Sequence, residues 1–237
     1  MYISIDWKGG DYMAEKKRSN TSSYNHSHCY KPFISPNPKT SFNPVQRSPK
    51  IDKTAFISQF SSVIGDVTIR DNVYVAPNVS IRADEGTPFY IGSNTNIQDG
   101  VILHGLLSKR FSVEGKKYSI FIGDEVTIAH GALVHGPCCI DDKVFVGFNA
   151  IVYDAIVGRG SFISYNAVVT NGVRIAPNRF VPPGANIDSQ EKADALSPVP
   201  VDSKEFAREV QRVNQEFPAS YNVLFGKNRC SCGIAFD

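Results

Sequence analysis

The sequence contains no long apolar run. In its 237 residues no stretch approaches the roughly 18 consecutive apolar residues of a membrane-spanning helix. The first thirty residues also lack the apolar centre of a secretory signal. We therefore expect a cytoplasmic protein with no membrane partner.

The sequence also lacks a large net charge of either sign. Lys and Arg number 25 against 23 Asp and Glu, which leaves a net charge of +2. The basic residues form no long run or stripe, so a nucleic-acid partner has little electrostatic support. With 42% apolar and 20% charged residues, the composition fits one globular domain with tails.

The sequence also lacks a regular cysteine pattern. The chain has 5 cysteines, an odd number. Their positions, Cys29, the adjacent Cys138 and Cys139, and the close pair Cys230 and Cys232, show no regular spacing. This excludes the even, regularly spaced framework of a disulfide-stabilised secreted domain.

The chain divides by composition into three regions. Residues 1–50 are rich in Ser, Asn, Pro and Lys, with eight basic side chains against three acidic ones, and we expect a disordered or extended arm there. Residues 51–190 contain an internal repeat, and residues 191–237 read as a helix followed by a tail.

The repeat has a period of six and places an aliphatic residue at each step. Apart from two insertions and one deletion, the series is unbroken. Its members are Ile51, Ile57, Val63, Ile69, Val75, Ile81, Ile91, Ile97, Leu103, Ile122, Ile128, Val134, Ile140, Val146, Val152, Val157, Ile163, Val169, Ile175, Val181 and Ile187. Most are β-branched, and Gly, Asn and Asp lie between them, as strands and tight corners require.

A hexapeptide repeat of this kind resembles the left-handed parallel β-helix. In that fold three short strands form one triangular coil, and a continuous core runs through the stacked coils. The predicted fold class is therefore all-β with a C-terminal helix, with about seven coils in the β-helix. The handedness is an exception to the right-handed rule for crossovers between parallel strands.

A helix is predicted over Val201–Phe217. Asp202 and Glu205 have the spacing of a capping box. Four apolar residues share one face at helical spacing: Phe206, Val210, Val213 and Phe217. This apolar face must pack against another surface. We expect that surface to be an outer face of the three-sided β-helix prism, either in the same chain or in a neighbouring subunit.

Threading the repeat onto three faces aligns polar residues into a column. The residue after each buried position points outward, because side chains alternate along a strand. Arg82, His104 and His135 follow core positions on one face in three successive coils, at roughly the 4.8 Å spacing of neighbouring strands. A lone surface histidine is usually only solvated, but two imidazoles one coil apart can bind a single metal ion.

A third histidine falls on the next face. His130 follows the core residue there, and Gln98 and Asp99 lie one coil earlier. A different face of a rigid prism cannot reach the same metal, but a second chain can bring it there. These face assignments predict that the face with Arg82, His104 and His135 meets the next subunit's face with His130. Repeated head to tail, this contact closes into a homotrimer, with Arg82 paired to Asp99 across the interface.

Three neutral imidazoles with an open fourth position are the ligand set of a catalytic zinc, since structural zinc is normally closed by a fourth protein ligand. Zinc lowers the pKa of its bound water to roughly 7, which provides hydroxide at neutral pH.

The motifs around these residues are similar to those of the γ-class carbonic anhydrases. This family includes archaeal enzymes and the N-terminal domain of the cyanobacterial carboxysome scaffold protein. The resemblance runs from about Asn43 to Phe217. Its motifs are Arg82-Ala-Asp84-Glu85-Gly86, Asn96-Ile97-Gln98-Asp99-Gly100, His104-Gly105, and His130 through His135-Gly136-Pro137.

The resemblance implies reversible hydration of CO₂ to bicarbonate by a metal-bound hydroxide at trimer interfaces. Zn²⁺, or Fe²⁺ or Co²⁺, would be bound by His104, His130 and His135. Gln98 would orient the hydroxide, and Glu85 would assist CO₂ polarisation or proton transfer. Relatives of this kind also imply partners of the carboxysome type and a carboxysome-associated location.

Four further positions match the family pattern. Arg82, Asp84 and Asp99 would hold the interface and orient the site, although a purely structural ion-pair cluster explains them equally well. Asn214, in a Val-Asn step on the predicted helix, matches an active-site position of the family.

Two departures from the family concern proton transfer and the helix. The archaeal enzymes have a long acidic loop after the first histidine, whereas Leu106–Tyr118 is short and basic, with Glu114 as its single carboxylate. Fast proton export is therefore not assured. The family's tyrosine near the Val-Asn step is replaced by Arg212.

Two other functions stay open. One is a scaffold or binding protein that keeps the trimer but has lost fast catalysis. The other is a hexapeptide-repeat acyltransferase, which uses one histidine as a base and binds coenzyme A between prisms. Such an enzyme does not need three histidines that converge on a metal.

Overall fold

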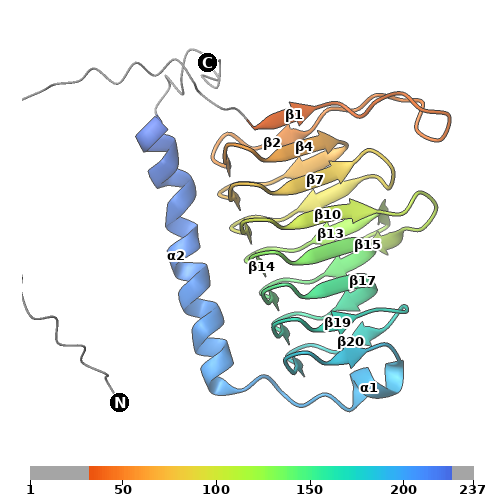
Figure 1. Ribbon diagram of the computed structural model, residues 1–237, viewed down its shortest axis with the longest axis vertical. Helices are drawn as coiled ribbons and strands as arrows, with labels where there is room; N and C mark the ends of the chain where they lie inside the picture. Colours follow the sequence, from red (N-terminus) through yellow and green to blue (C-terminus); the bar gives the residue numbers. More distant parts are fainter. Residues whose placement is uncertain (1–31, 226–237) are drawn as a thin grey trace, which may run out of the picture.

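A computed structural model describes residues 32–225, which form a left-handed, three-sided β-solenoid of about 8 turns with a long helix beside it. Figure 1 shows the coils stacked along the long axis, with helix α2 running along one side of the stack. The predicted fold class is thus confirmed. The predicted arm up to residue 31 and the tail from residue 226 onward lie outside the described residues.

Two faces of the prism belong to one 13-stranded sheet, because β15 and β17 continue around a corner. The strands of the first face are β1 (Phe33–Ser35), β4 (Ser62–Gly65), β7 (Ser80–Ala83), β10 (Ile102–Gly105), β15 (Leu133–Ile140), β17 (Ile151–Val157), β19 (Val168–Val169) and β22 (Asn186–Ile187). The second face consists of β2 (Lys50–Ile51), β5 (Val67–Ile69), β8 (Phe89–Ile91), β13 (Ile120–Ile122), the second halves of β15 and β17, and β20 (Arg174–Ile175).

The third face is a separate 7-stranded sheet. Its strands are β3 (Phe56–Ile57), β6 (Tyr74–Val75), β9 (Asn96–Ile97), β14 (Thr127–Ile128), β16 (Phe145–Val146), β18 (Phe162–Ile163) and β21 (Phe180–Val181). All strand pairs within the prism are parallel, as a coiled solenoid requires. The prism begins earlier than Ile51, because β1 pairs with β4 in register from Phe33 and Ser62.

The repeat residues form the core. Every member of the hexad series is buried except Ile51, which is half-buried near the first coil. Apolar residues between them, such as Val73, Val101 and Val126, are also fully buried. The period of six therefore reflects one inward-pointing aliphatic side chain on each short strand, stacked on its equivalents above and below.

Asparagines occupy many of the corners in the left-handed backbone region that corners require. Asn72 and Asn94 have φ values of 51° and 56°. They stack on neighbouring coils, where Asn72 Nδ2 donates to Asn94 Oδ1 at 2.9 Å.

The insertion at Leu106–Tyr118 includes a hairpin. Strands β11 (Phe111–Val113) and β12 (Lys116–Tyr118) pair antiparallel. Glu114 and Gly115 form the turn, with φ values of 48° and 78°. Glu114 therefore lies at the hairpin tip.

Two helices follow the prism. Helix α1 (Gln190–Asp194), which the sequence analysis did not predict, is capped by the Ser189 side chain. Helix α2 spans Val201–Phe225, so its predicted end at Phe217 is wrong. The helix continues through Pro218 because aromatic rings beyond it pack on the prism; Tyr221 stacks on Phe56 with ring centroids 5.0 Å apart. Within residues 32–225, no helix has the length and apolar character needed to cross a bilayer.

Helix α2 packs on the third face of its own prism, against β3, β6, β9 and β14. The predicted capping box is wrong, because Asp202 already lies inside the first helical turn. The predicted apolar face is only partly covered: Phe217 packs on the core, whereas Phe206 and Val213 are each 37% exposed.

Candidate metal centre

His104 and His135 lie side by side on neighbouring coils of the first face. The strand register aligns Arg82, His104 and His135 in one column, as predicted. His104 Nδ1 and His135 Nε2 are 3.3 Å apart. Two nitrogens at about 2.05 Å from one tetrahedral zinc are separated by about 3.3 Å. The two imidazoles are therefore spaced as ligands of a single ion.

Both imidazoles are held in a form suited to metal binding. His135 Nδ1 lies 3.2 Å from the Gly136 carbonyl oxygen, so its N–H can donate there and leave Nε2 with a free lone pair. Burial, and next the Arg82 guanidinium, lower the pKa of His104 below its ordinary value. The neutral imidazole, the form that binds metals, is thus favoured at His104.

Arg82 and Asp84 flank His104. Arg82 Nε donates to Asp84 Oδ2 at 3.1 Å, and Asp84 Oδ1 lies 3.5 Å from His104 Nε2. Asp84 Oδ1 is buried and has no hydrogen-bond partner among residues 32–225. The Asn43 side chain fixes the local backbone by donating to the Asp84 carbonyl at 3.1 Å.

Glu85 stands at the edge of the same group. Its Oε2 lies 3.7 Å from His104 Nε2, and its side chain is 39% exposed. Its Oε1 accepts a hydrogen bond from the Leu107 backbone N–H at 3.2 Å. The carboxylate therefore touches both the histidine and solvent. We call Arg82, Asp84, Glu85, His104 and His135 the paired-histidine face.

His130 lies elsewhere, just beyond β14 of the third face. His130 Nδ1 is 3.1 Å from Asp99 Oδ2 of the previous coil, and both side chains are more than half exposed. The Phe148 ring stacks on the imidazole, with centroids 5.5 Å apart. Since Asp99 occupies Nδ1, the other ring nitrogen is left for a ligand.

Gln98 is held by a hydrogen-bond chain that the sequence analysis missed. Its Nε2 donates to Asn96 Oδ1 at 3.1 Å, and Asn96 Nδ2 donates to Gln211 Oε1 and to Thr127 Oγ1, each at 2.8 Å. The Asn-Ile-Gln spacing contained a signal for Asn96, since residues two apart share a strand face. Gln211 comes from α2, and only the packing of the helix reveals it.

Asn214 also reaches this group. Its side chain is buried, and its Nδ2 donates to the Val210 carbonyl at 2.9 Å. Asn214, Gln98 and His130 line one cavity of about 260 Å³ between α2 and the third face. We call Gln98, Asp99, His130 and Asn214 the single-histidine face.

The two groups lie on different faces of one chain. Across residues 32–225, no three His, Cys, Asp or Glu side chains come together as a metal site. Arg82 pairs with Asp84, and Asp99 contacts His130, so the Arg82–Asp99 pair between subunits stays a prediction. Each chain therefore carries two of the three predicted histidines on one face and the third on another.

Comparisons with known proteins give relatives over most of the chain. It is 40% identical over 176 residues to the carbonic anhydrase of Methanosarcina thermophila, a match that covers 70% of this chain and 71% of that protein. It is 34% identical over 146 residues to the mitochondrial gamma carbonic anhydrase 1 of Arabidopsis thaliana, covering 62% of this chain and 50% of that one. No family model matches the chain.

Other relatives are longer. The chain is 43% identical over 189 residues to the carboxysome assembly protein CcmM of Nostoc sp.; the match covers 79% of this chain but only 34% of CcmM. Among solved structures, a hexapeptide transferase family protein from Anaplasma phagocytophilum has a TM-score of 0.62 at 22% identity, covering 80% of this chain and 98% of that one. This likeness reflects the shared fold. The identity to the archaeal and plant enzymes shows that the chain belongs to the γ-class carbonic anhydrase family.

Proposed function

We propose that the chain forms a homotrimer that hydrates CO₂ reversibly to bicarbonate at a metal centre in each subunit interface. The observation that supports this most is the 3.3 Å separation of His104 Nδ1 and His135 Nε2, on a face that lacks a third ligand. His130, on another face of the same prism, is 56% exposed at its side chain. A neighbouring copy can supply what each face lacks.

The residues fit a zinc ion, with Fe²⁺ or Co²⁺ as alternatives. His104 and His135 of one chain and His130 of the partner subunit would hold it, which leaves a fourth position open. Bound zinc would lower the pKa of a coordinated water to roughly 7 and so make a nucleophile available near neutral pH.

Gln98 would orient the attacking water. Its Nε2 is bonded to Asn96, so its carbonyl oxygen remains to accept a hydrogen bond from that water. Asn214 lines the same cavity with its Nδ2 bonded to the Val210 carbonyl, so its side-chain oxygen would likewise be available to accept a hydrogen bond from that water. Both amides are buried and cannot turn freely, so they would be preorganised for the reaction.

Glu85 would carry the proton away. The Leu107 N–H holds one carboxylate oxygen, and the second faces His104 at 3.7 Å from its Nε2. Its side chain is 39% exposed in the single chain, and from the edge of the site it would pass the proton to buffer. Glu114, at the hairpin tip, has no contact with these groups in the described part of the chain.

A second candidate is a scaffold protein with the same trimer and slow or no catalysis. The 43% identity to CcmM of Nostoc sp. supports it. The same relation supports a carboxysome as the setting, with carboxysome proteins as partners, for either candidate.

The test is metal analysis together with stopped-flow CO₂ hydration on the full chain, loaded with zinc or, without oxygen, with Fe²⁺. We expect about one metal per chain and fast hydration, with both lost in His104→Ala and retained in Arg70→Gln, a surface change elsewhere. Full metal occupancy without hydration would favour the scaffold. No metal, together with coenzyme A-dependent acyl transfer, would instead favour the acyltransferase alternative.

A further inference from the structure

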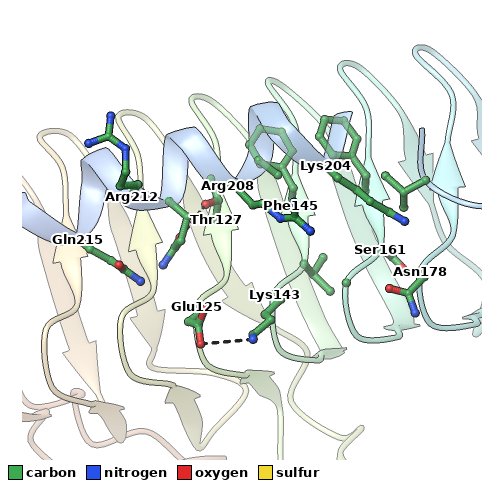
Figure 2. Close-up of a pocket in the computed structure, with 16 residues that line it drawn as sticks. Glu125, Thr127, Lys143, Phe145, Ser161, Asn178, Lys204, Arg208, Arg212 and Gln215 are labelled. Atoms are coloured by element: carbon green, nitrogen blue, oxygen red, sulfur yellow. Dashed lines mark hydrogen bonds and ion pairs between the residues drawn. The ribbon is translucent and has the colours of Figure 1, made fainter. Parts of the chain in front are cut away.

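A second cavity lies on the other side of α2 from Asn214. It has a volume of about 410 Å³, within the usual range for small-molecule sites. It runs between α2 and strands β14, β16 and β18 of the third face (Figure 2). None of the proposed metal ligands lines it, so it is a separate site.

The charge that lines this cavity is strongly positive. Its lining includes four cations, Lys143, Lys204, Arg208 and Arg212, and a single carboxylate, that of Glu125. The carboxylate is already matched, because Lys143 Nζ lies 3.7 Å from Glu125 Oε1. Since the whole chain has a net charge of only +2, this is a local concentration of cations.

Three cations of α2 line this cavity, and their spacing along the helix is electrostatically unfavourable. Lys204, Arg208 and Arg212 are spaced at i, i+4 and i+8, where like charges repel. Arg212 has a partner outside the cavity in Glu216, at 3.8 Å. Lys204 and Arg208 form no ion pair with any residue from 32 to 225, and Figure 2 shows both over the cavity.

The floor of the cavity is apolar. Phe145 and Phe162 stack with centroids 4.5 Å apart and are almost fully buried. Val199 adds to this surface. At the rim, the Asn178 side chain supplies a further hydrogen-bonding group. Because Phe145, Phe162 and Val199 are packed beneath the cavity, the groups it offers to a ligand are the cationic and amide side chains around it.

From these features we infer that this cavity binds a small anion with two or more phosphate or carboxylate groups. Lys204 and Arg208, which form no ion pair within residues 32–225, would hold its anionic groups, and the Asn178 side chain at the rim would supply a further hydrogen bond. Arginine and lysine pair strongly with such groups when both partners are partly shielded from water. A volume of about 410 Å³ suits a small molecule better than a protein segment.

Calorimetry of the full chain with pyrophosphate and with citrate tests this. We expect saturable binding that weakens with added salt, and at least tenfold weaker binding of acetate. Arg208→Gln and Lys204→Gln should each lower the affinity about tenfold, as loss of a charge-assisted hydrogen bond implies. Arg70→Gln removes the same charge from a different face and should have no effect.

Three outcomes would overturn the inference. One is no binding of either probe to a folded chain. Another is equal weakening by Arg208→Gln and Arg70→Gln, which would indicate only diffuse attraction to positive charge. The last is tighter binding of a decaglutamate peptide through the same residues, which would assign the cavity to a protein partner. Calorimetry does not depend on CO₂ hydration, so failure of the proposed enzyme activity would be seen separately.

Discussion

The Ser119 hydroxyl fills the space where a side chain on Gly105 would begin. A Cβ added to Gly105 would lie 2.2 Å from Ser119 Oγ and 3.4 Å from Ser119 Cβ. The Ser119 hydroxyl itself is buried and has no hydrogen-bond partner among residues 32–225. Gly105 directly follows His104, so a side chain at this position would force Ser119 or the histidine strand to shift.

A double-mutant cycle tests this contact. Gly105→Ala should destabilise the fold by about 1–3 kcal/mol, the usual cost of overpacking. Ser119→Ala should be close to neutral, because it removes an unpaired buried hydroxyl. The double variant should regain most of the lost stability, since the methyl group added at position 105 would then meet the methyl group at position 119 and Phe89 Cε1, each at 3.4 Å. Thermal melting at fixed protein concentration measures this, and simple additivity of the two changes would contradict it.

Mixed trimers test whether the metal ligands come from two chains. We expect a homotrimer of about 78 kDa from three 26.0 kDa chains. His130→Ala and His104→Ala should each abolish metal binding while the prism stays folded, because both side chains are outside the core. After mixing equal amounts of the two, about a quarter of the sites should regain metal, since one interface in each mixed ring has all three histidines.

The matched control mixes His104→Ala with His135→Ala. Both changes lie on the paired-histidine face, so no interface in this mixture is complete. Native mass spectrometry would verify the mixed trimers, and metal analysis would count the sites. Recovery in the control, or none in the test mixture, would mean that the ligands are not divided between chains as proposed.

Proton export should depend on Glu85 when buffer is scarce. Glu85→Gln keeps an acceptor for the Leu107 N–H but cannot transport a proton. We expect turnover at low buffer to fall about 10²-fold, the lower end of the effect of general acid–base groups, with partial rescue by imidazole-type buffers. Glu114→Gln at the hairpin tip is the control and should change nothing. Fast turnover that ignores both buffer and Glu85 would require a different proton carrier.

The thiol of Cys139 should react slowly at neutral pH. Burial raises its pKa to about 11, and the neighbouring Asp141 adds to this. Because the thiolate is the reactive form, alkylation at pH 8 should be about a hundredfold slower than for an ordinary thiol, and the rate should still rise above pH 9. In a variant with Cys29, Cys230 and Cys232 changed to Ser, only the thiols of Cys138 and Cys139 remain to be alkylated. Cys138, whose burial raises its pKa to about 12, should react only after unfolding. A rate that levels off near pH 8.5 would contradict this.

The sequence alone was sufficient to predict the prism and the histidine column. The period of six resembles that of the left-handed β-helix and places one aliphatic residue on every strand, so register follows from counting once the insertions are treated as loops. Once register is known, Arg82, His104 and His135 must share a face, and His130 with Asp99 must share another. The structure agrees at each of these positions.

Contacts between distant residues were decided only by the tertiary structure. The predicted apolar face ends the helix at Phe217, but Tyr221 stacks on Phe56 of the prism and α2 extends to Phe225. The chain from Gln98 through Asn96 to Gln211 joins residues more than a hundred positions apart. The cationic cavity likewise exists only because α2 lies on the third face. A repeat specifies its own stacking, since each coil meets an equivalent coil. The partner of a non-repeating helix is set by the particular side chains that it meets.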